Sequence, residues 1–133
     1  MSTTSATDAV PTGNTYDKYG SRNPVVRRLM ANFERTLGEL FTQAAPSSVL
    51  DVGCGEGVLT HKWAKALGDK RIVGIDLDDE KLKAEQAKRQ APNLEYLVMR
   101  AEHLPFADGE FGMAAAIEVL EHVPDPEHTL SEM

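Results

Sequence analysis

The spacing of apolar side chains along the 133-residue chain predicts alternating helices and short strands. The first long segment opens at Asn23-Pro24, a favourable N-cap followed by a proline at the first helical position. Its apolar side chains then recur every three or four residues up to Pro46, which predicts one amphipathic helix. The members of this stripe are Val26, Leu29, Met30, Phe33, Leu37, Leu40, Phe41 and Ala44.

Four short apolar runs predict strands, at residues 48–52, 71–75, 94–99 and 113–117. Helices are predicted at residues 58–67, at residues 78–90 and from Asp125-Pro126 onwards. Strands that alternate with helices through short connections favour a parallel sheet covered on both faces. The runs are continuously apolar, as burial of both faces requires. We therefore predict an α/β fold, a doubly wound, Rossmann-like parallel sheet.

Composition and charge exclude several classes of protein. The single cysteine excludes a disulfide within the chain. No apolar run approaches the roughly 20 residues that cross a bilayer, and the first residues lack the basic and apolar regions of a secretory signal. We expect a cytoplasmic protein that does not contact membranes. Residues 1–15 are rich in small polar side chains and are predicted to be a mobile tail.

The net charge of −7 is unevenly distributed along the chain. All 14 Lys and Arg residues lie within residues 1–100, so the acidic segment 101–133 contains none. Affinity for nucleic acid depends largely on Lys and Arg. The charge pattern therefore disfavours a nucleic-acid partner, and a solvated acidic surface is the simpler interpretation of the last segment.

A glycine-rich turn, Gly53-Cys54-Gly55-Glu56-Gly57, joins the first predicted strand to the helix after it. Glycines allow a ligand to approach the backbone closely. The following helix begins with unpaired N–H groups and the positive end of its dipole. In open α/β sheets, ligands bind at the carboxyl ends of the strands where the strand order reverses. The turn is therefore predicted to bind a ligand.

Neighbouring residues restrict what that ligand is. Val58 occupies the position of the last glycine of the dinucleotide fingerprint, which disfavours an NAD-dependent enzyme. Asp51 directly before the turn would repel phosphate and attract a cation. Asp76, at the end of the second strand, is placed to accept hydrogen bonds from two ribose hydroxyls. These features predict a nucleoside ligand without a diphosphate.

Four motifs occur in order: D-V-G-C-G-E-G, G-I-D, A-E-H-L-P-F-A-D-G-E-F and I-E-V-L-E-H-V-P-D-P. Together they resemble the class I S-adenosylmethionine-dependent methyltransferases, especially the small-molecule branch that includes enzymes of ubiquinone and menaquinone biosynthesis. The resemblance covers residues 16–133 as one domain. It implies methyl transfer from S-adenosyl-L-methionine to an oxygen, carbon or nitrogen of a small-molecule acceptor, leaving S-adenosyl-L-homocysteine.

The resemblance also implies roles for residues around the glycine turn. Gly53 and Gly55 would lie against the methionine part of the cofactor, and Asp51 would hold its amino group indirectly. Asp76 would bind the ribose hydroxyls, and Leu77 would pack on the adenine. The resemblance thus implies that the glycine turn and the end of the second strand bind different parts of the same cofactor.

Further members of the implied site come from other segments. Ala101 and Glu102 would edge the adenine, and Glu118 would lie near the sulfonium end. Tyr16 and Tyr19 would help to close the cofactor site. The family often has Asp at the position of Arg100, so adenine recognition here would depend on the backbone and Glu102. No (D/N)-P-P-(Y/F) sequence follows the fourth strand, which disfavours methylation of base amino groups.

The remaining candidate chemistry involves Cys54 and the segment Glu118-x-x-Glu121-His122. Cys54 is interpreted as a cofactor-site residue that fills space, because nothing nearby supplies a base for a nucleophile. Two carboxylates and an imidazole could bind Mg²⁺ or Mn²⁺, a pattern similar to the metal site of RNA 3′-terminal ribose 2′-O-methyltransferases. The preferred interpretation has no metal: Glu118 serves the cofactor, and His122 lines the acceptor pocket as the candidate catalytic base.

The family fold has seven strands in the order 3-2-1-4-5-7-6. The sequence of this chain predicts only four strands, which correspond to the order 3-2-1-4. We therefore expect a C-terminally incomplete form of a longer methyltransferase. Its fourth strand would be an open apolar edge, which favours pairing with a second copy of the chain. A module that binds the cofactor without turnover remains the principal alternative function.

Overall fold

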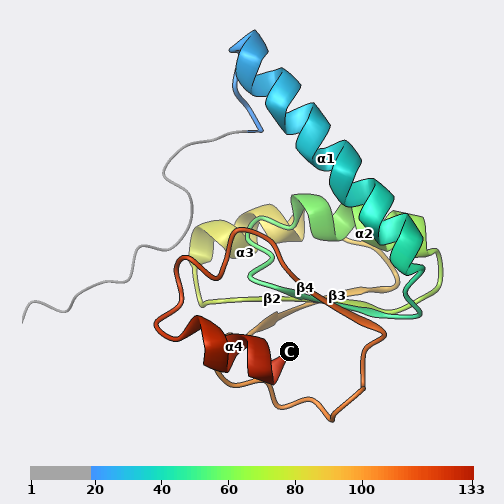
Figure 1. Ribbon diagram of the computed structural model, residues 1–133, viewed down its shortest axis with the longest axis vertical. Helices are drawn as coiled ribbons and strands as arrows, with labels where there is room; N and C mark the ends of the chain where they lie inside the picture. Colours follow the sequence, from blue (N-terminus) through green and yellow to red (C-terminus); the bar gives the residue numbers. More distant parts are fainter. Residues whose placement is uncertain (1–18) are drawn as a thin grey trace, which may run out of the picture.

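Four parallel strands form one sheet in the order β3-β2-β1-β4 in the computed structural model, which describes residues 19–133 (Figure 1). The strands are β1 (Val49–Val52), β2 (Ile72–Asp76), β3 (Leu94–Val98) and β4 (Met113–Ala116). Register places Asp51 beside Gly74 of β2 and Ala115 of β4. The predicted α/β class and strand order are confirmed. The predicted mobile tail at residues 1–15 lies outside the described residues.

The helices are α1 (Pro24–Ala44), α2 (Val58–Leu67), α3 (Glu80–Ala87) and α4 (Pro126–Glu132). Figure 1 shows α2 and α3 on one side of the sheet and α4 on the other. Asn23 caps α1, and Asp125 caps α4, as the sequence predicts. None of the helices within residues 19–133 is both long and apolar enough to span a bilayer.

Helix α3 is shorter than the predicted segment 78–90 and begins after a different cap. The Asp79 carboxylate accepts from the backbone N–H groups of Lys81 and Leu82, at 2.8 and 3.0 Å. Asp78 instead pairs with the Lys83 ammonium group on the surface. Asp79 is therefore the cap, which leaves the Asp76 carboxylate available for other partners.

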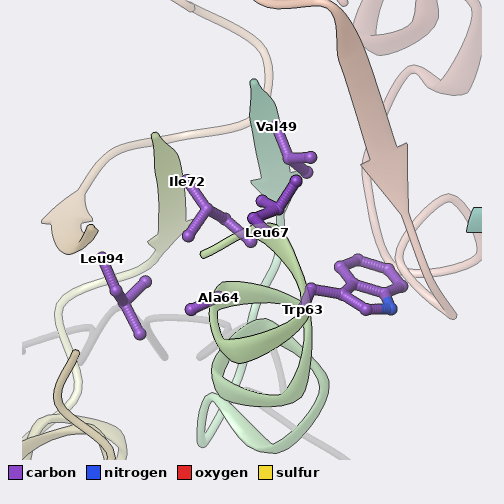
Figure 2. Close-up of a cluster of buried hydrophobic side chains, with 6 residues drawn as sticks. All are labelled: Val49, Trp63, Ala64, Leu67, Ile72 and Leu94. Carbon is purple, nitrogen blue, oxygen red and sulfur yellow. The ribbon is translucent and has the colours of Figure 1, made fainter. Parts of the chain in front are cut away.

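The core is divided between the two faces of the sheet because successive side chains of a strand point in opposite directions. One face holds Val49, Ile72 and Leu94, which pack against α2 (Figure 2). The α2 side chains in this cluster are Trp63, Ala64 and Leu67. The other face holds Leu50, Val52, Val73, Ile75 and Leu104. Burial on both faces holds the ends of β1 and β2 in place, and the glycine turn starts from the end of β1.

Helix α1 has the predicted apolar stripe, but none of its residues is fully buried. Phe41 stacks on Trp63 of α2 with ring centroids 5.2 Å apart, whereas Leu29 and Leu40 are 63% and 56% exposed. Leu29 and Leu40 belong to the predicted stripe, but both side chains remain largely exposed. The apolar stripe is wider than the contact between α1 and α2, so only the side chains along the middle of the stripe are half-buried.

Strands β3 and β4 are the edges of the sheet. All four residues of β4 are half-buried, and the strand pairs only with β1. The predicted edge position of the fourth strand is therefore confirmed. Association of two copies through this edge stays a prediction.

Candidate functional site

The glycine turn adopts left-handed backbone conformations at Gly53, Gly55 and Gly57, with φ angles of 72°, 56° and 80°. The N–H groups of Gly53 and Cys54 donate to the Ile75 carbonyl at 2.8 and 2.9 Å. These bonds fold the turn over the end of β2. The sequence therefore forms the predicted turn at the carboxyl end of the sheet, at the point where strand order reverses.

The surroundings of the three glycines differ. A Cβ atom at Gly53 would collide with the Val119 side chain, and one at Gly57 would collide with the Tyr96 hydroxyl. A Cβ atom at Gly55 would meet nothing within 4 Å among the residues that the structure describes. Gly53 and Gly57 therefore permit close packing within the protein, whereas Gly55 faces open space that a ligand can occupy.

Asp76 ends β2 beside this open space. One oxygen of its carboxylate accepts from the Gly55 N–H at 2.6 Å, and the other accepts from the Leu77 N–H at 2.7 Å. A carboxylate has about four acceptor positions. Two positions therefore remain for hydroxyl groups of a ligand.

Asp51 is only 3% exposed at the end of β1, and one of its oxygens accepts a hydrogen bond from the Thr60 hydroxyl at 2.7 Å. Burial raises the pKa of the Asp51 carboxyl to about 7, the Thr60 hydrogen bond opposes this rise, and the negative charge of Asp76 adds to it. Near neutral pH, this carboxyl is therefore close to its titration point. A cation bound beside it would favour the ionised form.

The raised pKa of Asp51 predicts a specific pH dependence of stability. A carboxyl whose folded pKa exceeds its unfolded pKa binds its proton more tightly in the folded state, so its contribution to stability falls as pH rises from about 4 to 7. Asp51→Asn removes this titration. We expect the variant to gain stability relative to the unsubstituted chain as pH rises, by up to about 4 kcal/mol above pH 7. Urea denaturation without ligand at pH 5, 6, 7 and 8 measures the difference.

Asp69→Asn is the control, because Asp69 is an exposed carboxyl remote from the site. Its stability difference from the unsubstituted chain should stay nearly constant over the same pH range. If the free energy of unfolding changed with pH in the same way for Asp51→Asn and the unsubstituted chain, ionisation of Asp51 would not reduce stability. That result would contradict the prediction.

Cys54 lies in the turn and packs against β2. Its sulfur is 3.0 Å from the position that a Cβ atom at Gly74 would occupy. Burial raises the pKa of the Cys54 thiol, and the charges of Asp51 and Asp76 raise it further. The thiol therefore stays protonated, which agrees with its interpretation as a space-filling residue of the turn rather than a nucleophile.

Tyr19 and Glu118 come from distant parts of the sequence, and Tyr19 lies within electrostatic range of both Glu118 and Asp51. Burial raises the pKa of Tyr19, and the charges of Glu34, Glu118 and Asp51 raise it further. Glu118 follows β4 with a φ of 57°, an uncommon conformation for a residue with a side chain. Such strain is concentrated at functional sites. Tyr16, the second predicted tyrosine, lies outside the described residues.

The segment after β3 runs beside Asp76, because the Met99 N–H donates to the Asp76 carbonyl at 3.0 Å. In this segment, Ala101 packs against the apolar cluster on the α4 side of the sheet. The Glu102 carboxylate lies 3.4 Å from the Arg100 guanidinium. Arg100 is therefore paired with Glu102, the residue expected to edge the adenine.

His122 is exposed, and its Nε2 atom is 3.6 Å from the Glu121 carboxylate. Within residues 19–133, no group of three or more His, Cys, Asp or Glu side chains is arranged to hold a metal ion. The side chains of Glu118, Glu121 and His122 are thus not gathered into a ligand set. The proposed role of His122 as a base stays a prediction.

A cavity of about 160 Å³ lies away from this site, on the side of the sheet that carries α4. It is lined in part by Leu104, Phe111 and Met133. The three glycines of the turn, Asp51 and Asp76 are not among the described residues that line it. We therefore place the candidate site at the strand ends, where the chemically distinctive residues converge, rather than in this cavity.

Sequence reasoning missed the contribution of α3 to the glycine turn. The Gln86 amide donates to the Gly55 carbonyl at 2.8 Å, and Arg89 donates to the Glu56 carbonyl at 3.2 Å. These contacts link residues 31 and 33 positions apart in the sequence. No local pattern distinguishes Gln86 from the other polar residues of this helix, so only the fold reveals the contact.

Comparison with known proteins identifies a family match over most of the chain. The methyltransferase domain family matches residues 50–133. The chain is 40% identical over 88 residues to the ubiquinone biosynthesis O-methyltransferase of Psychrobacter cryohalolentis, covering 62% of this chain and 33% of that protein. The chain therefore spans about a third of the length of this relative.

Solved structures support the same fold. A Bacillus halodurans C-125 protein assigned as a methyltransferase is 30% identical, with a TM-score of 0.62 over 72% of this chain and 43% of that one. The magnesium protoporphyrin IX methyltransferase of Synechocystis, determined with bound S-adenosylhomocysteine, has a TM-score of 0.61 over 85% and 55% of the two chains. At 18% identity, the second similarity shows the fold alone.

Proposed function

Because the chain belongs to the methyltransferase domain family, we propose that it binds S-adenosylmethionine at the glycine turn and directs the methyl group to a small-molecule acceptor. The observation that carries this proposal is the open space at Gly55 beside the acceptor-rich Asp76 carboxylate. The similarity to a ubiquinone biosynthesis O-methyltransferase supports a small-molecule acceptor. We propose that the acceptor atom is an oxygen, a carbon or a nitrogen. We propose residues 16–133 as the cofactor-binding domain.

The residues present fit the nucleoside part of this cofactor. The two unused acceptor positions of Asp76 suit the paired hydroxyls of a ribose. Leu77, which follows Asp76, is half-buried and supplies an apolar surface for adenine. Ala101 and Glu102 are on the segment that passes the end of β2, so they are proposed to edge the same ring.

The charges suit the other end of the cofactor, which carries a sulfonium and an ammonium group. Asp51 and Glu118 contribute negative charge near the turn, and Tyr19 lies close enough to respond to both. Attraction of a cation in a partly buried site exceeds that in bulk water. We propose that Asp51 ionises when the cofactor binds and that Tyr19 covers the cationic end.

When bound, S-adenosylmethionine supplies a methyl group activated by its sulfonium. The chain then contributes mainly alignment of the acceptor with that methyl group, because holding two reactants in place lowers the barrier to transfer. A base is needed where the acceptor must lose a proton. His122 is the proposed base, since it is exposed in the segment that follows Glu118.

Ligand-dependent thermal unfolding tests the proposed cofactor. S-adenosylhomocysteine at about 100 times its dissociation constant should stabilise the chain by about 2.7 kcal/mol. NADH at the same concentration should leave the melting temperature unchanged, because the turn lacks the dinucleotide spacing. Stabilisation by NADH alone would contradict the proposal.

A cofactor-binding module without turnover is the second candidate function. It is favoured by the location of the 160 Å³ cavity, which lies on the α4 side of the sheet and away from the strand ends. Incubation with methyl-labelled S-adenosylmethionine and candidate acceptors separates the two functions. Binding with labelled product supports the methyltransferase, whereas binding without product supports the module.

A further inference from the structure

We infer that Gln86 of α3 is a positioning residue that fixes the peptide groups of Gly55 and thereby sets the affinity for the methionine part of the cofactor. This inference rests on the proposed function, because it deepens the description of the same site. It concerns a residue outside the four sequence motifs. Gln86 is half-buried on the side of α3 that meets the glycine turn.

Gly55 is the residue of the turn that most needs external support. Backbone hydrogen bonds tie Gly53, Cys54 and Gly57 to one another or to β2. Gly55 is held instead by side chains from the β2–α3 unit: Asp76 accepts from its N–H at 2.6 Å, and Gln86 donates to its carbonyl at 2.8 Å. The Cys54 thiol, a weak donor, approaches the same carbonyl at 3.9 Å.

Fixing this residue has a direct consequence for ligand binding. Glycine has more backbone freedom than any other residue, so it loses the most conformational entropy when a ligand requires one conformation. Gly55 has a φ of 56° and faces open space. If Gln86 holds that conformation before the ligand arrives, less of the ordering cost is left to the binding step.

Helix α3 is itself anchored at both ends, so Gln86 is a stable point of attachment. Its first turn is capped by Asp79, three residues after Asp76. Near its end, Arg89 bonds to the Glu85 carboxylate at 3.0 Å, and the Arg89 carbonyl accepts from the Tyr96 hydroxyl at 2.8 Å. Helix α3 thus joins the proposed ribose-binding carboxylate to the glycine turn.

Two ligands separate positioning from general structural support. S-adenosylhomocysteine contains the amino-acid part that would pass Gly55, whereas 5′-methylthioadenosine shares the nucleoside and sulfur but lacks that part. Gln86→Met keeps a side chain of similar length and removes the donor. We expect it to weaken binding of S-adenosylhomocysteine about tenfold, as loss of one hydrogen bond predicts, and to leave 5′-methylthioadenosine binding unchanged.

Calorimetric titration of the full chain measures both affinities. Gln43→Met is the matched control, since Gln43 is exposed near the end of α1, and it should change neither affinity. Gln86→Ala, which favours helix more strongly than methionine, serves as a second variant and should give the same selective loss.

Each outcome discriminates between hypotheses. Equal weakening of both ligands would assign Gln86 to general support of the fold and overturn its positioning role. Unchanged binding of S-adenosylhomocysteine by Gln86→Met would also overturn that role, while the proposed function would stand. If the unsubstituted chain bound neither ligand, the proposed function itself would fall, and the inference with it.

Discussion

Gly55→Val should abolish binding of S-adenosylhomocysteine while leaving the chain folded. The substituted side chain would project into the open space beside the turn, because a Cβ atom at Gly55 meets no atom of residues 19–133 within 4 Å. The left-handed φ of 56° is also unfavourable for a β-branched residue. We expect affinity to fall at least about a hundredfold, equivalent to about 2.8 kcal/mol. Calorimetric titration measures the loss, and circular dichroism checks the fold.

Gly109→Val controls for the cost of the backbone conformation. Gly109 has a φ of 70° and also has no described residue within 4 Å of its Cβ position, but it lies in the connection before β4. Both variants should lose a similar amount of stability, and only Gly55→Val should lose the ligand. If Gly55→Val bound S-adenosylhomocysteine as tightly as Gly109→Val does, the ligand would not pass the glycine turn.

Much of the site's framework could be predicted from sequence because local patterns and strand topology coincide. The continuous apolar runs of β1 and β2 predict strands buried on both faces, and the residues that follow them must then meet at one edge of the sheet. Asp51 is the third of the four residues of β1, and Asp76 is the last residue of the neighbouring β2. Their proximity therefore follows from connectivity. Their unequal exposure follows from their positions along the strands, because Asp51 lies within its strand and Asp76 ends its strand.

Other features depend on contacts that no local pattern encodes. Val119 and Tyr96 approach two glycines from different segments, and Gln86 reaches the turn from a helix without an apolar stripe. The end of β4 shows the same limit, since the left-handed conformation of Glu118 is not expected of a residue with a side chain. These details depend on how the segments pack in three dimensions.

The apolar stripe of α1 shows why periodicity alone overestimates burial. An amphipathic pattern reports that a helix has an apolar side, but the width of the covering partner decides how much of that side is removed from water. Here α2 contacts α1 through the Phe41–Trp63 stack and the Glu34–Lys62 pair. The flanking Leu29 stays 63% exposed.

The site contains two carboxylates, Asp51 and Asp76, whose environments differ. Asp51 is buried and near its titration point, whereas Asp76 has its carboxylate tied to two backbone N–H groups. Two carboxylates in different environments can serve different parts of one ligand. A cation suits the position of Asp51, and hydroxyl donors suit the remaining acceptor positions of Asp76.

Asp76→Ala should weaken both S-adenosylhomocysteine and 5′-methylthioadenosine, in contrast to Gln86→Met. Both ligands contain the ribose, and a hydrogen bond to a charged group contributes about 1.5–3 kcal/mol. Loss of two such bonds predicts a fall in affinity of about a hundredfold or more. The variant also releases the Gly55 N–H, which Asp76 holds at 2.6 Å, so S-adenosylhomocysteine should lose at least as much affinity as the shorter ligand.

Asp78→Ala is the matched control for this effect, because Asp78 is two residues away, exposed, and paired with Lys83 on the surface. Its removal should change neither affinity, since surface ion pairs contribute little. If Asp76→Ala kept both affinities within about threefold, the ribose would have to bind elsewhere. A ligand whose hydroxyls are held by this carboxylate would lose more affinity than that. A loss restricted to S-adenosylhomocysteine would instead mean that Asp76 acts only through Gly55, and the ribose would then need another acceptor at the end of β2.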